Sequence, residues 1–374
     1  MSFSAEIVEP GALSRTDLAH WRALCDGLPA YRSPLLSPEF ALAVGAVRSD
    51  ARVAVLKRRG ATVGFLAHHR RPNGYARPIG APFSDYHGVV ADPAAGLNLA
   101  DALSAAGLRR FRHRGLVGSE APPGAVPVEG HAIDLGAVSA DAHLEALRSV
   151  DAKRFKNWRR LSHKLDREQA DISFGPDRDP DALRRVIGWK RAQLRRSGLH
   201  DVLRPAWVER MMNGLFSEGE EAFGGLLITL RVGGRPIAGH FGVRRGPVFH
   251  PWVAAFDPEF SAYSPGVLFM LRAIELMPAL NLQVYDLSAG SDHYKKPFTN
   301  ASIIAWDGVT AVEGARGRGQ APCPAPAAGV TRRLGKRLEQ IAAAEPSLAG
   351  RLRGLFETVQ NAPKRLAGAA PDLS

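Results

Sequence analysis

The chain has 374 residues, of which 45% are hydrophobic and 23% are charged. This composition is typical of globular domains and excludes a largely disordered chain. Lys and Arg outnumber Asp and Glu by 49 to 37, giving a formal net charge of +12. The excess favours anionic partners such as nucleic acid, acidic lipid or a nucleotide cofactor, although it can also serve solubility alone. The only two cysteines, Cys25 and Cys323, exclude a disulfide framework and a cysteine-based zinc site.

The first part of the chain predicts a separate lobe over residues 1–134. A helix is expected at residues 17–28, and two apolar runs around Arg58-Arg59-Gly60 predict a β-hairpin at residues 51–69. A segment rich in Pro and Gly at residues 118–130 indicates a connection. The N-terminus lacks the features of a secretion signal, and no apolar run approaches the ~18 residues of a spanning helix, so we expect a cytoplasmic protein.

A long helical region is predicted to begin at Ser139, which suits an N-cap, and to run to about residue 168. Its apolar residues keep helical spacing, and two more helices follow at residues 181–196 and 206–216. The polar face of the first region is basic. It either binds the phosphates of a ligand or is an ordinary face exposed to solvent. The basic residues are Lys153, Arg154, Lys156, Arg159, Arg160, Lys164 and Arg167.

The next part of the chain predicts three antiparallel strands joined by short turns, at residues 226–232, 235–245 and 248–257. A helix at 265–277 and a strand at 282–288 follow. This order indicates an α+β fold and not a doubly wound parallel sheet. Residues 311–374 begin as a linker rich in Gly, Ala and Pro and end in basic amphipathic helices, which are suited to peripheral contact with an anionic membrane.

The helix at residue 265 has a start suited to anion binding. Ser264 is a favourable N-cap residue, Pro265 fits the first helical position, and Gly266 has no side chain to obstruct a ligand. The free N–H groups of a first helical turn favour a phosphate or carboxylate. The turn alone is weak support, because many structural helices start in this way.

The order of these elements resembles the GNAT acyltransferases, and within them the CelD-like branch associated with cellulose and exopolysaccharide biosynthesis. The resemblance covers residues 135–300 and rests on the basic helix together with four short motifs. These are Pro236-Ile237-Ala238-Gly239, Ser264-Pro265-Gly266, Asp286-Leu287 and Tyr294-Lys295.

The resemblance implies two GNAT-like lobes with mixed sheets flanked by helices. The first lobe (1–134) is degenerate, residues 135–310 form the acyltransferase domain, and residues 311–374 form a linker and helical tail. An acyl-CoA is implied as co-substrate, with no metal. Its pyrophosphate would be held by Tyr263, Ser264, Pro265 and Gly266. The loop has a single Gly and no Arg or Gln at its start, unlike the usual GNAT signature. This departure keeps open the related Fem-type transferases, which use aminoacyl-tRNA.

Acyl transfer requires a base for the acceptor and an acid for the departing thiolate. Asp286, at the end of its strand, is the candidate base, and Tyr294 is the candidate acid, as the GNAT resemblance implies. Lys295 is expected to bind a phosphate of the donor or acceptor, and His240 to contact substrate. His240 and His250 are alternative bases. The adjacent His68 and His69 point to opposite faces of a strand and do not form a metal site.

Three functions are therefore considered. The first is an acyl-CoA-dependent transferase acting on an amine or hydroxyl of a sugar or sugar-nucleotide. The second is an aminoacyl-tRNA-dependent transferase of the same architecture. The third is a GNAT-derived component without catalysis that takes part in assembling a polysaccharide-producing machine.

Overall fold

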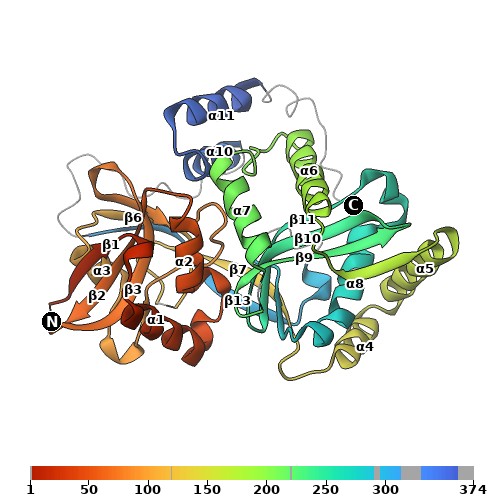
Figure 1. Cartoon of the computed structure of the whole chain (residues 1–374), viewed down its shortest axis with the longest axis horizontal. Coiled ribbons are helices and arrows are strands. Elements are labelled where there is room, and N and C mark those ends of the chain that lie inside the picture. The colour runs from red at the N-terminus through yellow and green to blue at the C-terminus, as the bar shows by residue number, and fades with distance from the viewer. Residues whose placement is uncertain (1, 119, 220, 290–294, 313–329, 361–374) are drawn as a thin grey trace. The chain divides into compact units, whose positions relative to one another are not determined.

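The computed structural model describes residues 2–118, 120–219, 221–289, 295–312 and 330–360. The chain divides into two compact units. The first comprises Met1–Glu129 and Ile304–Pro346, and the second comprises Gly130–Ile303 and Ser347–Ser374. Each unit combines a sheet with helices, which confirms the predicted α+β class (Figure 1). Among the described residues, no helix has the length and apolar character needed to cross a membrane.

The first unit is built on the strands β1, β2, β3, β4, β6 and β13, in that spatial order. The predicted hairpin is confirmed: β2 and β3 pair in antiparallel fashion, and Arg59 and Gly60 turn the chain with φ values of 52° and 83°. Helix α1 (Arg15–Gly27) covers this sheet by stacking Trp21 on Phe65. The strands are Ser4–Val8, Ala51–Arg58, Ala61–Arg70, Tyr75–Pro78, Arg110–Leu116 and Ala301–Ala311.

Helix α10 (Val330–Ala344) belongs to this first unit, although the sequence placed it in a separate tail. Ile341 and Ala344 are buried. Glu339 forms ion pairs with Arg77 at 2.9 Å and Arg112 at 2.8 Å. Buried apolar side chains and a shared carboxylate therefore fix α10 to its unit.

The second unit is built on the strands β7, β12, β11, β10, β9 and β8, in that spatial order. The predicted meander is confirmed, because β9, β10 and β11 pair in antiparallel fashion within a residue or two of the expected bounds. Strand β12 adds to β11 in parallel. The bounds are Val126–Asp134 (β7), Val284–Asp286 (β12), Val248–Phe256 (β11), Arg235–Arg245 (β10), Gly224–Val232 (β9) and Ile172–Pro176 (β8).

The long basic helical region is confirmed as two helices, α4 (Ala140–Val150) and α5 (Ala152–Glu168). Ser139 caps α4 as expected, accepting a hydrogen bond from the backbone of Ala142. Asp151 interrupts the region because its backbone leaves the helical conformation while its side chain caps α5. Asp is favoured at such a cap and disfavoured inside a helix.

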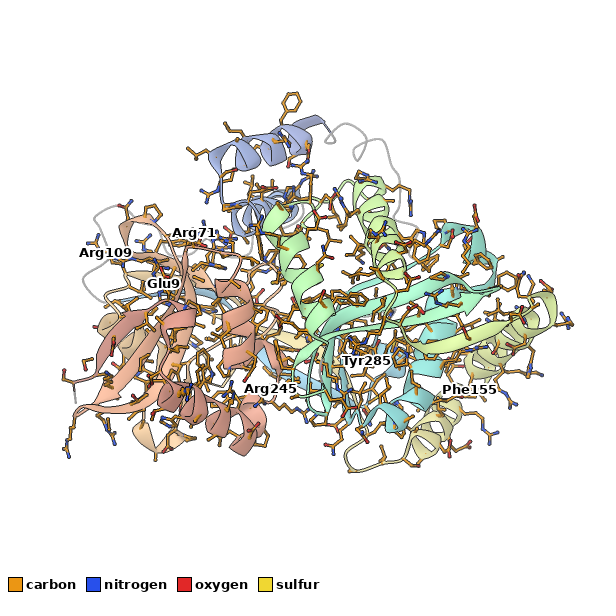
Figure 2. All side chains as sticks on the ribbon, in the orientation of Figure 1. Glu9, Arg71, Arg109, Phe155, Arg245 and Tyr285 are labelled. Carbon is orange, nitrogen blue, oxygen red and sulfur yellow. The ribbon has the colours of Figure 1, made fainter. Side chains whose placement is uncertain are left out.

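Helices cover both faces of the second sheet (Figure 1). On one face, α5 and α8 (Pro265–Leu276) contribute Trp158, Leu165 and Phe269 to a core that includes Tyr285 of β12 (Figure 2). On the other face, α6 (Pro180–Arg196) approaches closely at Gly239, where an added Cβ would lie 2.5 Å from the side chain of Val186. Helix α7 (Ala206–Glu218) packs on the same face as α6.

Candidate functional site

Strands β11 and β12 diverge after a short parallel contact. Their register contains only Val248 opposite Val284 and Phe249 opposite Tyr285, whereas β11 stays paired with β10 up to Phe256. We call this divergence the fork. The insertion of Trp252 as a bulge in β11, between the partners of Phe241 and Gly242, increases the local twist of the strand. Bulges of this kind are common beside active sites.

The predicted base Asp286 lies at the fork, where β12 ends. Its Oδ1 accepts a hydrogen bond of 2.8 Å from the backbone of Ser288, and its Oδ2 lies 3.5 Å from Nδ1 of His250 on β11. Both side chains are buried. One oxygen of Asp286 therefore stabilises the following turn, and the other faces the imidazole of His250. The structure thus places Asp286 beside one of the two alternative histidine bases.

The second alternative base, His240, is held differently. Its Nδ1 lies 2.7 Å from the hydroxyl of Tyr285, and its ring stacks on Phe269 with centroids 4.0 Å apart. Burial, together with the smaller effect of the charges of Lys190 and Lys295, lowers the pKa of His240 to about 3. An imidazole that stays neutral at pH 7 is a weak base, so the geometry favours a positioning role for His240.

Two lysines supply positive charge near this histidine. Lys295 donates hydrogen bonds to the carbonyl oxygens of Leu287 and Ala289, immediately after β12. Lys190, on α6, has its Nζ 3.4 Å from the carbonyl oxygen of Ala254 on β11. Burial lowers the pKa of Lys190, and the neighbouring charge of Lys295 adds to this effect.

Lys190 was not predicted from the sequence because it lies within a run of basic residues on α6. A signal was present in the spacing, however. Ala182, Leu183 and Val186 form the buried face of α6, and Lys190 follows Val186 by four residues. Residues four apart in a helix lie on the same side. Lys190 was therefore predictable as a basic residue of α6 directed toward the sheet.

The start of α8 differs from the prediction at Ser264. This residue occupies the N-cap position, but its backbone is left-handed (φ 51°, ψ 58°) and its side chain makes no capping hydrogen bond. An N-cap side chain normally acts from an extended backbone, which explains the difference. Pro265 is buried at the first helical position, as expected, and Gly266 follows it. A left-handed conformation is costly for a residue other than Gly, and such strain tends to occur at functional sites.

The first turn of α8 is the predicted site for the phosphates of acyl-CoA. It contains no acidic residue, so the positive end of the helix dipole is not neutralised within the turn. The ammonium group of Lys164, on α5, lies 5.0 Å from the centre of the Tyr263 ring, just before the turn. The hydroxyl of Tyr263 is bonded to Glu168 (3.0 Å) and Gln169 (3.1 Å). Tyr263 would therefore contribute to an anion site mainly through its backbone.

The basic face of α5 borders a groove of about 990 Å³ that also includes the end of α4. A second groove of about 700 Å³ shares part of this lining and reaches α8 at Leu268, Leu271 and Arg272. The structure thus joins the basic helix to the middle and last turns of α8, whereas Ser264, Pro265 and Gly266 at its start are not part of this lining. The basic residues of the first groove are Arg148, Lys156, Arg159, Arg160, Lys164 and Arg167.

The predicted acid Tyr294 lies outside the described residues. Over the parts of the chain that the structure describes, no group of three or more His, Cys, Asp or Glu side chains is placed to hold a metal ion. His68 and His69 are both buried in the first unit. The polar side chains that the structure describes at the fork include Asp286, His250, His240, Lys190 and Lys295.

A known protein family matches the part of the chain that contains the fork. Residues 152–296 match the model of an acetyltransferase (GNAT) domain. The chain contains a GNAT-type acetyltransferase domain. The match begins at the first residue of α5 and includes the fork and the start of α8. The chain is accordingly an acyltransferase.

Solved structures support the same fold. FemX is 11% identical with a TM-score of 0.54, over 81% of this chain and 96% of FemX. A conserved protein of unknown function from Bacteroides thetaiotaomicron VPI-5482 is 12% identical with a TM-score of 0.50, over 83% of this chain and all of that one. A tandem GNAT protein from the clavulanic acid biosynthesis pathway is also similar, at 10% identity and a TM-score of 0.44 over 83% of this chain and 98% of that one, but a score this low carries no weight for the fold. No protein with a curated description matched the sequence.

Proposed function

We propose that the protein transfers an acyl group from acyl-CoA to an amine or hydroxyl of a sugar or sugar-nucleotide, in the context of exopolysaccharide biosynthesis. The observation that carries the proposal is that a GNAT-type domain combines the fork between β11 and β12 with an α8 N-terminus free of acidic residues in its first turn. The nature of the acceptor rests on the sequence resemblance to the CelD-like branch.

The residues at the fork have different roles in the proposed reaction. The acceptor nitrogen or oxygen attacks the thioester carbon, the carbon–sulfur bond breaks, and the acceptor loses one proton. Asp286 receives this proton, assisted by His250 at 3.5 Å. The positive charges of Lys190 and Lys295 stabilise the negative charge that develops on the carbonyl oxygen of the thioester. Tyr294 is proposed to return a proton to the thiolate.

A thiol-release assay tests the proposal. Purified protein is incubated with acetyl-CoA and a panel of amino sugars, neutral sugars and sugar-nucleotides, and free CoA is measured with a thiol reagent. We expect at least one sugar acceptor to raise CoA release above the acceptor-free rate, and Asp286→Asn to remove the increase. If an unrelated amine raises CoA release but no sugar does, the sugar acceptor would be contradicted and acyl-CoA would remain supported as the donor.

A second candidate donor, aminoacyl-tRNA, is favoured by the basic grooves along α4 and α5. Protein–RNA contacts release counterions, so binding becomes steeply salt-dependent. If the donor is a tRNA, Arg159→Glu with Arg160→Glu should weaken binding and flatten its salt dependence. The matched pair Arg184→Glu with Arg185→Glu, on exposed positions of α6, should have little effect. Equal loss in both pairs would indicate attraction by net charge alone.

A further inference from the structure

Helix α11 (Leu348–Gln360) carries an exposed apolar stripe. Leu348 is 76% exposed, Leu352 66% and Phe356 62%, and Leu355 completes the stripe. Counted from Leu348, the other three follow at four, seven and eight positions, so all four lie on one side of the helix. They are four of the large hydrophobic side chains that are exposed in the described part of the chain, and they occur together on a single helix.

The opposite side of α11 attaches the helix to the second unit. Gly354 and Thr358 are buried, and the Thr358 hydroxyl donates to the carbonyl oxygen of Gly354 at 2.7 Å. Glu357 pairs with Arg204, which precedes α7, at 2.7 Å. The helix is therefore anchored by a small polar face, and this anchoring leaves the stripe directed outward.

Positive charge borders the stripe on both sides. At about 100° per residue, the four apolar side chains cover an arc of roughly 100°, with Arg351 beyond one edge and Arg353 beyond the other. Glu357, the acidic residue of the helix, is engaged with Arg204 on the anchored side. Lys364 and Arg365 follow in the sequence, and the whole chain has a net charge of +12.

We propose that α11 is a membrane-surface helix that binds anionic lipid, with its apolar stripe among the acyl chains and Arg351 and Arg353 at the lipid phosphates. An apolar arc bordered by basic side chains is the pattern of helices that lie in the plane of a membrane interface. A contact between two copies through the same stripe fits less well, because it would place the arginines of both copies at one interface. The inference is independent of the identity of the acceptor.

Vesicle sedimentation of the full chain tests the proposal. Vesicles of phosphatidylcholine are compared with vesicles in which about a third of the lipid is phosphatidylglycerol, at ~0.1 M and ~0.5 M NaCl. We expect the wild type to bind the anionic vesicles at least about tenfold more tightly, and to lose most of this preference at high salt. Leu352→Gln with Phe356→Gln should abolish binding, whereas the control pair Val150→Gln with Leu199→Gln, also at exposed positions, should not.

Two results would overturn the proposal. One is equal binding of anionic vesicles by the wild type and the stripe variant, which would assign the attraction to the net charge of the chain. The other is a dimer, seen by light scattering without lipid, that the stripe variant converts to a monomer. Because the substituted side chains are exposed, the variant should keep the thermal unfolding midpoint of the wild type. As a second readout, the added fluorescence of Phe356→Trp should be quenched by brominated lipid.

Discussion

Nδ1 of His250 on β11 lies 3.5 Å from Oδ2 of Asp286 at the end of β12. The pair follows directly after Phe249 and Tyr285, the last residues at which the two strands are in register. A carboxylate and an imidazole thus meet where the sheet opens. Because both side chains are buried, their charges act in a medium that screens them weakly.

This arrangement predicts that Asp286→Asn lowers kcat by about 100-fold to 10,000-fold, the usual contribution of a general base. The asparagine oxygen can still accept the hydrogen bond from Ser288, so the fold should be preserved. Steady-state kinetics and the dissociation constant for CoA are measured together, with the exposed Asp166→Asn as control. A kcat within about threefold of the wild type would exclude Asp286 as the base.

Lys190→Met is expected to raise thermal stability and to lower activity. The substitution removes a half-buried positive charge that lies near Lys295 and keeps most of the side-chain volume. Functional sites often hold such unfavourable charges because activity requires them. The unfolding midpoint and kcat/KM are compared with those of Lys156→Met on the exposed face of α5. Loss of stability with full activity would show that Lys190 is structural.

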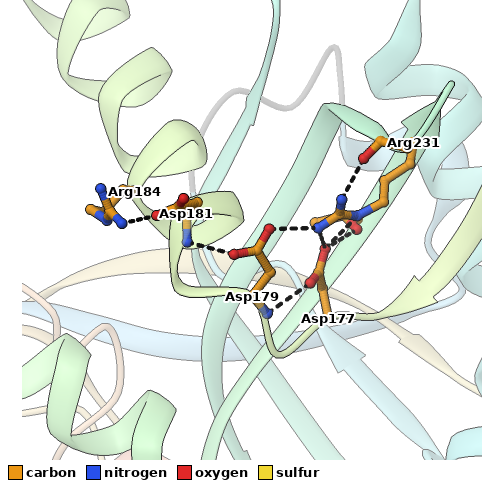
Figure 3. Close-up of polar contacts among 7 residues, drawn as sticks. Asp177, Asp179, Asp181, Arg184 and Arg231 are labelled. Carbon is orange, nitrogen blue, oxygen red and sulfur yellow. Dashed lines mark hydrogen bonds and ion pairs between the residues drawn. The ribbon is translucent and has the colours of Figure 1, made fainter.

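Arg231 fixes the loop that begins α6, the helix that carries Lys190 (Figure 3). Its guanidinium group contacts Asp177 at 2.7 Å and Asp179 at 3.2 Å. Arg231→Ala would leave the buried Asp177 without its cation, and we expect a loss of about 2 to 3 kcal/mol in the free energy of unfolding. Activity should fall as well. The exposed Arg184 pairs with Asp181 in the same region, so Arg184→Ala is the control in denaturant titration. Equal and small losses of stability in Arg231→Ala and Arg184→Ala would contradict the role of Arg231 in fixing this loop.

Stability should decrease as the pH falls from 7 to 5. Burial lowers the pKa of His68 to about 4 from its ordinary value of 6.5. Between these values the unfolded chain binds a proton that the native His68 does not, so acid favours unfolding. Replacing His68 with Leu should reduce the difference in the free energy of unfolding between pH 7 and pH 5 by about 2 kcal/mol. Denaturant titrations of the wild type and the variant at pH 7 and pH 5 measure this difference. If the substitution leaves the difference unchanged, His68 does not have the lowered pKa.

The strands and helices of the second unit were predictable because their patterns are local. The meander at β9 to β11 and helix α8 follow from alternating or helical apolar spacing interrupted by Gly and Pro. The division of the basic region at Asp151 was not predicted, because one capping residue changes the backbone without changing the apolar pattern.

Several residues of the site could be predicted from the sequence, but the contacts between them could not. Asp286, His240 and Lys295 were identified from the sequence, but their neighbours depend on strand register and on α6. The pairing of His250 with Asp286 requires β11 and β12 to be in parallel register, and no local pattern specifies this register. The left-handed backbone of Ser264 is likewise set by tertiary structure, since Ser normally adopts an extended conformation at a helix N-cap.

A thermal-shift titration with CoA and acetyl-CoA tests whether CoA binds at the start of α8. The titration compares wild type, Gly266→Glu and Gly214→Glu. Gly214 lies on α7 with open space around it, so it provides the same substitution away from the site. A ligand at about 100 times its dissociation constant adds about 2.7 kcal/mol to stability. We expect CoA to raise the unfolding midpoint of the wild type and of Gly214→Glu but not that of Gly266→Glu. Equal shifts in all three proteins, or no shift in the wild type at millimolar ligand, would contradict CoA binding at the start of α8.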